Sequence, residues 1–342
     1  MPTKPIFMVA HPRSCSTAFE RMFLTQADQI ECIHEPFCDA YHFGPERLSE
    51  RFEDEGVRAE SGYSQSTYQT VLDNIQAAST QGKRTFIKDM AKSLMPPLGK
   101  PVADLCPPSL RHLVRMSNGS ASRISNPTVL PEEILRGYHF TFLIRHPRFS
   151  IPSLYKISTP PGSDTTGWHG FHSDDAGYRE LRILFDYLKS TRQIGPVVAS
   201  GTSRPIDQGD CAPEDSYEAR PDTSVEICVI DADDLLNEPQ KVCRAYCASV
   251  GLQFNPSMLS WQSADDQKRA QDAFQKSWAI HVDALSSKSL DPSKNATEML
   301  SVTEENAMWA RRFGEDGAQV IRQHVDTNTP HYDYLKQFAL KI

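Results

Sequence analysis

The sequence predicts an α/β protein with a mostly parallel sheet flanked by helices. Short apolar runs that are typical of buried strands alternate along the chain with segments whose apolar residues recur at helical spacing. Strands are predicted at residues 5–10, 30–33, 85–88, 139–144 and 226–230. Because several of these runs are apolar at almost every position, they favour a sheet that helices cover on both faces.

Two helices in the middle of the chain support the same fold class. Residues 174–194 carry leucine and phenylalanine at the spacing of one helix face, and Asp174 or Asp175 is the predicted N-cap. Residues 238–250 carry a second apolar stripe. An acidic turn joins this helix to the strand at 226–230, so the segment forms a strand–turn–helix unit.

The remainder of the chain contains one further helix and two irregular segments. The helix is predicted at 302–325, with a break near Gly314–Gly317. Residues 106–132 and 195–224 are rich in residues that favour loops, and they are predicted to be insertions that act as lids or are disordered. We therefore expect a single domain over residues 1–342 with two insertions.

Composition and charge restrict the partners and the compartment. The 342 residues carry a formal net charge of −8, which argues against general binding to nucleic acid or to an acidic membrane. No apolar run reaches the roughly 18 residues of a membrane span, and no N-terminal segment has the pattern of a signal peptide. The eight cysteines include no C-x-x-C pair and no zinc-type spacing, so we expect reduced thiols, a cytoplasmic location and no metal. The oligomeric state is not predicted.

The segment after the first predicted strand has the composition of an anion site. Between this strand and a predicted helix lie Arg13, Ser14, Cys15, Ser16 and Thr17. The first backbone N–H groups of a helix have no partner within it, and the helix dipole adds positive potential there. The Arg13 guanidinium suits phosphate or sulfate oxygens, and the hydroxyl groups add further donors. The alternative is an ordinary strand–helix turn in which the hydroxyl residues are caps; His11 is expected to cap this turn.

A second loop of the same kind follows the strand predicted at 139–144. Arg145 stands at the carboxyl end of this strand, and Ser153 lies eight residues later. In open α/β sheets, ligands bind outside the carboxyl ends of the strands. The two loops are therefore expected to hold one ligand with two separated negative groups. His146, which borders the second loop, is expected, like His11, to cap its turn, and contact with the ligand is the alternative for both.

The paired loops resemble the two cofactor signatures of the PAPS-dependent sulfotransferase family, whose fold is similar to that of P-loop nucleotide kinases. PAPS is 3′-phosphoadenosine 5′-phosphosulfate. The resemblance implies that residues 12–17 hold the 5′-phosphosulfate and that Arg145 and Ser153 hold the 3′-phosphate. It extends loosely from residue 5 to about residue 262.

Two further segments resemble a fungal group of proteins with this fold. They are His34-Glu35-Pro36-Phe37 and Phe86-Ile87-Lys88-Asp89-Met90. The resemblance implies transfer of a sulfuryl group from PAPS to a hydroxyl or amine of a small organic acceptor in secondary metabolism. The product derived from PAPS would be adenosine 3′,5′-bisphosphate.

Several positions depart from the pattern of the family. Cys15 stands where many relatives have glycine, and we expect cysteine to replace glycine there only if φ is negative. The catalytic lysine of many relatives falls at Arg13, which is not an equivalent donor. The familiar catalytic histidine after the third strand is missing, because Met90 stands near its position. A Walker loop, G-x-x-x-x-G-K-[ST], is also missing, which argues against an ATPase or a kinase.

Five residues are candidates for the chemistry of sulfuryl transfer, which must offset negative charge on oxygen and remove a proton from the acceptor. Arg13 is expected to offset the charge, with Lys88 at the bridging oxygen or, alternatively, exposed to solvent. Glu35 is the first candidate for the base, because relatives that sulfate protein tyrosines carry a catalytic glutamate at a similar distance past the loop. Burial is expected to raise its pKa, although an ion pair with Arg13 is the alternative. Asp89 and then His34 are the next candidates for the base.

Other functions remain open at this point. Cys15 and Arg21 have the C-x-x-x-x-x-R spacing of cysteine phosphatases, but the residues between them contain no glycine. A sulfotransferase-fold enzyme without sulfation activity, such as a lyase or cyclase of small molecules, is a second alternative, and a nucleotide-binding module is a third. The aromatic residues expected near a small organic acceptor are Phe37, Tyr41, Phe43, Trp168 and Phe171.

Overall fold

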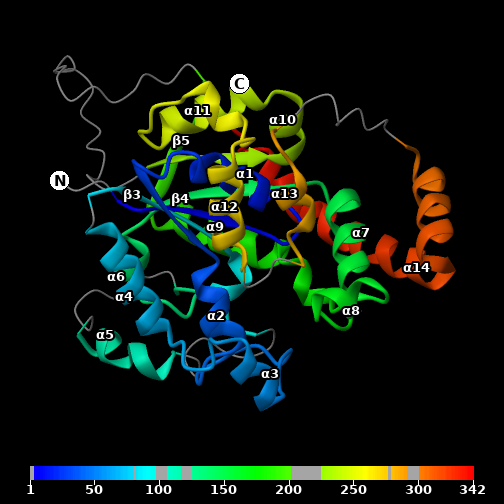
Figure 1. Ribbon diagram of the computed structural model, residues 1–342, viewed down its shortest axis with the longest axis horizontal. Coiled ribbons are helices and arrows are strands. Elements are labelled where there is room, and N and C mark those ends of the chain that lie inside the picture. The colour runs from blue at the N-terminus through cyan, green and yellow to red at the C-terminus, as the bar shows by residue number, and fades with distance from the viewer. Residues whose placement is uncertain are drawn as a thin grey trace.

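A computed structural model describes residues 4–80, 82–97, 106–116, 125–201, 225–275, 279–290 and 300–342. Its centre is a five-stranded sheet with the strand order β2-β3-β1-β4-β7 (Figure 1). These strands are β1 (Ile6–Ala10), β2 (Ile30–His34), β3 (Arg84–Met90), β4 (His139–Ile144) and β7 (Val229–Asp231). All neighbouring strands in this sheet are parallel, so the predicted fold class is confirmed.

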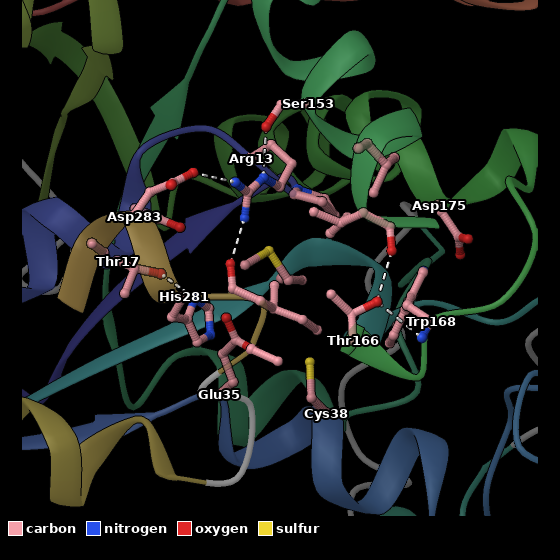
Figure 2. A pocket seen from close by; sticks show the side chains of 18 of the residues that line it. Arg13, Thr17, Glu35, Cys38, Ser153, Thr166, Trp168, Asp175, His281 and Asp283 are labelled. Carbon is pink, nitrogen blue, oxygen red and sulfur yellow. Dashed lines mark hydrogen bonds and ion pairs between the residues drawn. The ribbon is translucent and has the colours of Figure 1, made fainter. Parts of the chain in front are cut away.

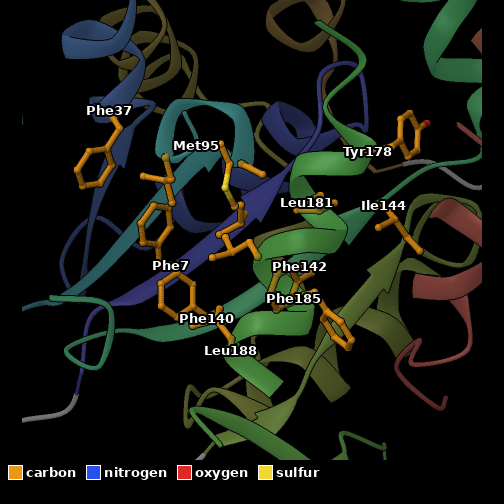
Figure 3. Packing of buried hydrophobic residues seen from close by; sticks show 14 of the residues in the cluster. Phe7, Phe37, Met95, Phe140, Phe142, Ile144, Tyr178, Leu181, Phe185 and Leu188 are labelled. Atoms are coloured by element: carbon orange, nitrogen blue, oxygen red, sulfur yellow. The ribbon is translucent and has the colours of Figure 1, made fainter. Parts of the chain in front are cut away.

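Helices cover both faces of the sheet because side chains alternate between the faces along each strand. On one face, Phe7 and Val9 of β1 belong to a core cluster that also includes buried residues of the helices α2 (Pro36–His42), α4 (Tyr68–Ser79), α9 (Tyr178–Ser190) and α14 (Val302–Lys336). Figure 3 shows this side of the core, with Phe7 beside the side chains of β4 and α9. On the other face, Ile6 and Met8 pack against α1 (Ser16–Leu24) and α11 (Pro239–Ser249).

Shorter elements complete the described part of the chain. The remaining helices are α3 (Glu55–Glu60), α5 (Arg111–Met116), α6 (Glu132–Leu135), α7 (Pro147–Ser158), α8 (Gly162–Thr166), α10 (Ala232–Asn237), α12 (Ala264–Ala273) and α13 (Val282–Ser286). Single 3₁₀ turns lie at Ala91–Leu94, Pro108–Leu110, Ser173–Ala176 and Pro256–Leu259. A second, two-stranded parallel sheet consists of β5 (Ile194–Val198) and β6 (Val225–Ile227).

The predicted strand at 226–230 is wrong in one respect. The chain passes from β6 in the small sheet to β7 in the main sheet across Cys228, so one apolar run serves two sheets. The insertion predicted at 195–224 begins inside β5, and its residues 202–224 lie outside the described residues. In the insertion predicted at 106–132, residues 117–124 also lie outside them.

The helix predicted at 174–194 starts later than expected. Gly177, with a φ of 72°, is the N-cap of α9, so neither Asp174 nor Asp175 caps this helix. Both carboxylates instead bind the Lys92 ammonium, at 3.1 and 2.7 Å. A side chain at Gly177 would lie 3.1 Å from Pro12, so this glycine lets α9 approach the loop after β1.

The break predicted in the last helix is confirmed. Gly314 has a φ of 76° inside α14, and the helix continues to Lys336, beyond the predicted end. Among the described residues, none of the helices has both the length and the apolarity that crossing a membrane requires. The seven described cysteines are all free.

Candidate active site

The loop between β1 and α1 has the form expected of an anion site, but its backbone is strained. The strand ends at Ala10 and α1 begins at Ser16, so the first N–H groups of this helix follow the loop directly. Arg13 and Cys15 both have left-handed backbone, with φ of 63° and 69°. The expectation that Cys15 has a negative φ is therefore wrong. A left-handed residue with a side chain costs roughly 1–2 kcal/mol, so the surrounding contacts must hold the loop in this conformation.

His11 joins this loop to the loop after β4. Its Nε2 accepts a hydrogen bond from the Arg145 N–H at 3.0 Å, and its Nδ1 lies 3.0 Å from the Pro12 carbonyl oxygen. Burial lowers the pKa of His11 to about 3, so the ring is neutral and can accept at one nitrogen while it donates at the other. His146 accepts a hydrogen bond from the Arg148 N–H in the first turn of α7. His146 thus caps its turn, as predicted, whereas His11 bridges the two loops.

The side chains predicted to bind the donor meet at the carboxyl ends of β1 and β4, which are neighbours. Arg13 Nε donates a hydrogen bond to Ser153 Oγ at 2.8 Å, and Arg145 Nη1 donates to the Arg13 carbonyl at 3.3 Å. Arg13 also donates to the Ile280 carbonyl at 2.8 Å and lies 3.5 Å from the Asp283 carboxylate (Figure 2). Ser153, expected beside Arg145, therefore contacts Arg13 instead.

Two buried donors at this place have no hydrogen-bond partner among the described residues. They are Ser14 Oγ in the first loop and Arg145 Nε after β4. Buried polar atoms nearly always have a partner, so such atoms indicate where a polar ligand is expected. Of the two residues, Arg145 lines the cavity, so an oxyanion bound there would give its Nε an acceptor.

A buried cluster of charges lies beside this anion site. The Lys88 ammonium, on β3, contacts Glu35 Oε1 and lies 3.5 Å from Thr17 Oγ1 and 3.8 Å from Glu20 Oε2. Glu35 follows β2 and lines the same cavity as Arg13, as its position at the carboxyl end of a strand of the same parallel sheet predicts. Burial acts to raise the pKa of Glu35, but Lys88, His34 and His281 together outweigh it and hold this pKa well below its usual value. The expected rise in the pKa of Glu35 is therefore wrong.

Asp89, the second candidate for the base, faces the opposite side of the sheet. Its carboxylate accepts hydrogen bonds from the N–H groups of Phe37 and Met90, at 2.6 and 2.7 Å, and from the Cys38 thiol at 3.3 Å. Burial and the nearby Glu35 raise the pKa of Asp89 to about 7. It is completely buried, and both oxygens accept hydrogen bonds at the start of α2. This geometry is that of a helix cap.

His281 is a site residue that the sequence analysis missed. It comes from the segment 279–290, and its Nδ1 lies 3.1 Å from Thr17 Oγ1 (Figure 2). Its Nε2 lies 3.2 Å from Nε2 of His34, the third candidate for the base. One ligand atom each from His34, Glu35 and His281 lies within 4.8 Å of the others, which is close enough to hold a metal ion. No spacing in the sequence connects His281 with the loops near the N-terminus, because only the tertiary fold brings them together.

A cavity of about 910 Å³ extends from the anion site to a group of aromatic side chains. Such a volume suits a ligand of nucleotide or drug size. The aromatic residues in its wall include His42, Phe43, Phe52 and Trp168. Of the aromatic residues predicted near the acceptor, Phe43 and Trp168 line the cavity.

The other three predicted aromatic residues are wrong, because they pack elsewhere. Phe37 stacks on Phe7 in the core, with the ring centroids 5.8 Å apart (Figure 3). Tyr41 is buried, with 3% of its surface exposed, and Phe171 packs against Tyr155. An aromatic side chain that is close to the site in sequence can therefore serve the core instead.

The geometry also argues against a cysteine phosphatase. Residues 16–20, between Cys15 and Arg21, are helical and do not wrap around an anion. The Arg21 guanidinium donates hydrogen bonds to the carbonyls of Ala284, Leu285 and Ser287, at 2.7, 3.1 and 3.1 Å. It therefore anchors the segment 279–290 to α1.

Comparisons with known proteins agree on one family. A family model described as a sulfotransferase domain matches residues 197–293. Sulfotransferase ppzF from Metarhizium rileyi is 26% identical over 274 residues, which are 78% of this chain and 73% of that protein. Sulfotransferase ppzF from Metarhizium majus is 25% identical over 274 residues, with the same shares. The resemblance to a fungal sulfotransferase-like group is thereby confirmed, and these names support a transferase.

Two solved structures are also similar to this chain. The sulfotransferase domain of the Synechococcus PCC 7002 olefin synthase has a TM-score of 0.36 and 14% identity, covering 91% of this chain and 94% of that one. The sulfotransferase domain of the curacin biosynthetic pathway has a TM-score of 0.38 and 11% identity, covering 91% and 98%.

Proposed function

We propose that this protein transfers a sulfuryl group from PAPS to a hydroxyl or amine of a small organic acceptor. The observation that carries the proposal is the meeting of the two loops after β1 and β4, where Arg13 and Arg145 both line the cavity and Arg145 Nε has no hydrogen-bond partner among the described residues. A ligand with two separated anionic groups would satisfy both loops at once. The similarity to fungal sulfotransferases supports the same reaction.

The residues at the anion end have the chemistry that the donor requires. The backbone N–H groups at the start of α1, including that of Thr17, and the hydroxyls of Ser14 and Ser16 would bind the 5′-phosphosulfate. Arg13 would exchange its bond to the Ile280 carbonyl for one to a sulfuryl or phosphate oxygen. Lys88, held by Glu35 and close to Thr17, would offset charge at the bridging oxygen. In this proposal Glu35 positions Lys88, because the ammonium makes its carboxylate a weak base.

The other end of the cavity suits an aromatic acceptor. Phe43 and Phe52 stack with their ring centroids 4.8 Å apart, and Trp168 lies edge-on to Phe52 at 5.7 Å. The Arg51 guanidinium covers Trp168 at 4.3 Å from the ring centroid, which fixes the indole in place. Flat, apolar walls of this kind favour a small aromatic or apolar molecule.

Calorimetry with adenosine 3′,5′-bisphosphate tests the donor site. We expect tight binding to the wild type and an affinity at least about tenfold weaker for Arg13→Ala and for Arg145→Ala, since a charged hydrogen bond contributes roughly 1.5–3 kcal/mol. Adenosine 5′-phosphate, which lacks the 3′-phosphate, should bind the wild type less well, and Arg145→Ala should lose most of this difference. Lys156→Ala, at an exposed position, is the control. Absence of binding would overturn the proposal.

Transfer itself is tested with ³⁵S-labelled PAPS and a panel of small phenols, alcohols and amines. A labelled product that depends on Arg13 supports sulfuryl transfer. Binding of the bisphosphate without transfer to any acceptor would favour an enzyme with this fold and another activity, or a nucleotide-binding module.

Cys15→Ser distinguishes the proposal from the phosphatase alternative. Serine keeps the size of the side chain and removes the thiolate, so we expect turnover and bisphosphate affinity within about tenfold of the wild type. Cys247→Ser, on the buried face of α11, is a control for the loss of a thiol elsewhere. A complete loss of turnover, together with a covalent adduct on Cys15 in the wild type, would contradict this role.

The proposal also covers the compartment, the domain organisation and the partner of the protein. We propose a cytoplasmic enzyme, which the free state of the seven described cysteines supports. We also propose that residues 1–342 form one domain, since one sheet carries a core cluster on each face. Its partner is a small molecule rather than nucleic acid or membrane, in keeping with the net charge of −8.

A further inference from the structure

A chain of hydrogen bonds leads from the cavity wall into the protein interior. Thr17 Oγ1 lies 3.1 Å from His281 Nδ1, His281 Nε2 lies 3.2 Å from His34 Nε2, and His34 Nδ1 lies 2.7 Å from Glu20 Oε2. Thr17 and His281 line the cavity, whereas Glu20 is completely buried. The chain thus has one end at the ligand and the other at a buried carboxylate.

The partners assign the proton positions along this chain. A carboxylate only accepts hydrogen bonds, so Glu20 requires a proton on Nδ1 of His34. Nε2 of His34 then carries a lone pair and accepts from the Nε2–H of His281. Nδ1 of His281 is left with a lone pair that faces Thr17 and the cavity. One tautomer of each ring satisfies all three bonds.

We propose that His281 is the general base for the acceptor and that His34 and Glu20 position it and share the proton. This inference rests on the proposed sulfuryl transfer. The acceptor O–H bond breaks as its oxygen bonds to sulfur, and the bond from sulfur to the leaving phosphate oxygen breaks. The proton goes to His281 Nδ1, directly or through the Thr17 hydroxyl. The Nε2–H proton of His281 passes to His34, and the Nδ1–H proton of His34 passes to Glu20 Oε2.

The surroundings of His281 fit this role. Burial, followed by the nearby His34, lowers the pKa of His281 well below its usual value, so the ring is neutral at neutral pH but is by itself a weak base. In the proposal, passage of the proton along the chain to the Glu20 carboxylate compensates for this weak basicity, and Glu35, which contacts the Lys88 ammonium, has no such chain. The charged groups that face it are Glu35, Lys88 and Arg13, and Phe274 packs against the ring. The arrangement is like that of a catalytic triad, in which a second group and a carboxylate orient the reactive group.

A metal ion is the competing use of the same cluster, because it would need one ring nitrogen each of His34 and His281 and an oxygen of Glu35. The Lys88 ammonium already contacts that Glu35 oxygen and would repel a dication. The proton chain uses the 3.2 Å contact between the two rings without displacing Lys88. The observations therefore favour proton transfer over metal binding.

The tautomers give a test that needs no substrate. In ¹⁵N NMR spectra of histidine-labelled protein at pH 7, we expect His281 to be protonated at Nε2 and His34 at Nδ1, with His281→Gln and His34→Gln used for assignment. Protonation of His281 at Nδ1 would overturn the proposal. So would stoichiometric binding of Zn²⁺ that is lost in both variants, since the metal would occupy both lone pairs.

Turnover gives the second test, with ³⁵S-labelled PAPS and the best acceptor of the panel. We expect His281→Ala to lower kcat about 10²–10⁴-fold, to leave bisphosphate affinity within about threefold, and to regain part of kcat when imidazole is added. His34→Gln should lower kcat with KM unchanged, and Glu20→Asp should retain more activity than Glu20→Gln. His172→Ala, at an exposed position outside the cavity wall, should behave as the wild type and gain nothing from imidazole.

The outcomes separate the two proposals. Absence of transfer by the wild type overturns the proposed function. Transfer by the wild type that survives in His281→Ala within about threefold overturns the base assignment alone. If Glu35→Gln rather than His281→Ala abolishes turnover at unchanged bisphosphate affinity, Glu35 is the base, and the assignment of His281 is wrong. His281→Asn replaces His281→Ala if the latter does not fold.

Discussion

Lys88→Met should destabilise the protein by about 3–5 kcal/mol at neutral pH, because it leaves two buried carboxylates without their ammonium. The Lys88 side chain is 0% exposed, and it contacts Glu35 and lies 3.8 Å from Glu20. Methionine keeps the length and apolar stem of lysine but cannot offset either charge. Since whole domains are stable by only about 5–15 kcal/mol, a loss of this size is a large share of the total.

Urea unfolding measures this loss, and a second substitution assigns its cause. Lys88→Met combined with Glu35→Gln should recover part of the lost stability, because one of the two buried charges is removed as well. In Lys88→Met alone, the loss should be smaller at pH 5 than at pH 8, since the unpaired carboxylates can take up protons. Lys156→Met, at an exposed position, should change stability by no more than about 0.5 kcal/mol. A loss below about 1 kcal/mol in Lys88→Met would show that other groups neutralise the cluster.

Stability should also fall steeply as the pH drops from about 6.5 toward 3. Burial lowers the pKa of His11, His42 and His139 to about 3 each. Between pH 3 and 6.5 these side chains bind protons in the unfolded chain, where the pKa is about 6.5, but not in the folded one, so acid favours unfolding. Each pKa unit corresponds to about 1.4 kcal/mol, so three such shifts together are large compared with the stability of a domain.

Thermal unfolding between pH 4 and pH 8 checks this expectation. His139→Leu should weaken the dependence of Tm on pH without breaking a hydrogen bond of Nε2, because that atom is buried without a partner among the described residues. His172→Gln, at an exposed position, is the matched control. Asp89 acts in the opposite direction. The pKa of Asp89 is about 7 in the folded state and about 3.8 in the unfolded chain, so the stability that it contributes is lost as the pH rises between these values. Asp89→Asn should therefore make the fall of Tm toward acid pH steeper. A constant Tm from pH 8 to pH 4 would contradict the prediction.

The main sheet could be predicted because its strands are short apolar runs, and two of its carboxyl ends are marked by polar loops. The small sheet of β5 and β6 could not be predicted from the sequence. β5 contains Gly195 and Pro196, and Pro196 and Val197 are exposed, so β5 lacks the apolar continuity of the other strands. The split of 226–230 could not be predicted either, since residues 227–230 are continuously apolar and the partners of each half are set by tertiary structure.

The candidate site could be predicted only where its residues follow strands. Arg13, Glu35 and Arg145 were found because the ends of parallel strands share one edge of a sheet. The role of Glu35 depends on the contact with Lys88, which sequence spacing cannot reveal. His281 lies on a segment with no periodic pattern, and it reaches the site because Arg21 binds three carbonyls of that segment. The conformation of Cys15 depends in the same way on its neighbours in three dimensions.

The adjacent residues Lys88 and Asp89 also determine how β3 aligns with its neighbours. Lys88 pairs with Met8 and faces the side of α1, whereas Asp89 pairs with Val9 and faces the N-terminus of α2. A slip of one residue would exchange their faces. Asp89 would then join Glu20 and Glu35 as a third carboxylate, and the Lys88 ammonium would point at the positive end of a helix. The charges thus penalise a misaligned strand that apolar side chains alone would tolerate, so the groups proposed for chemistry also select the native register during folding.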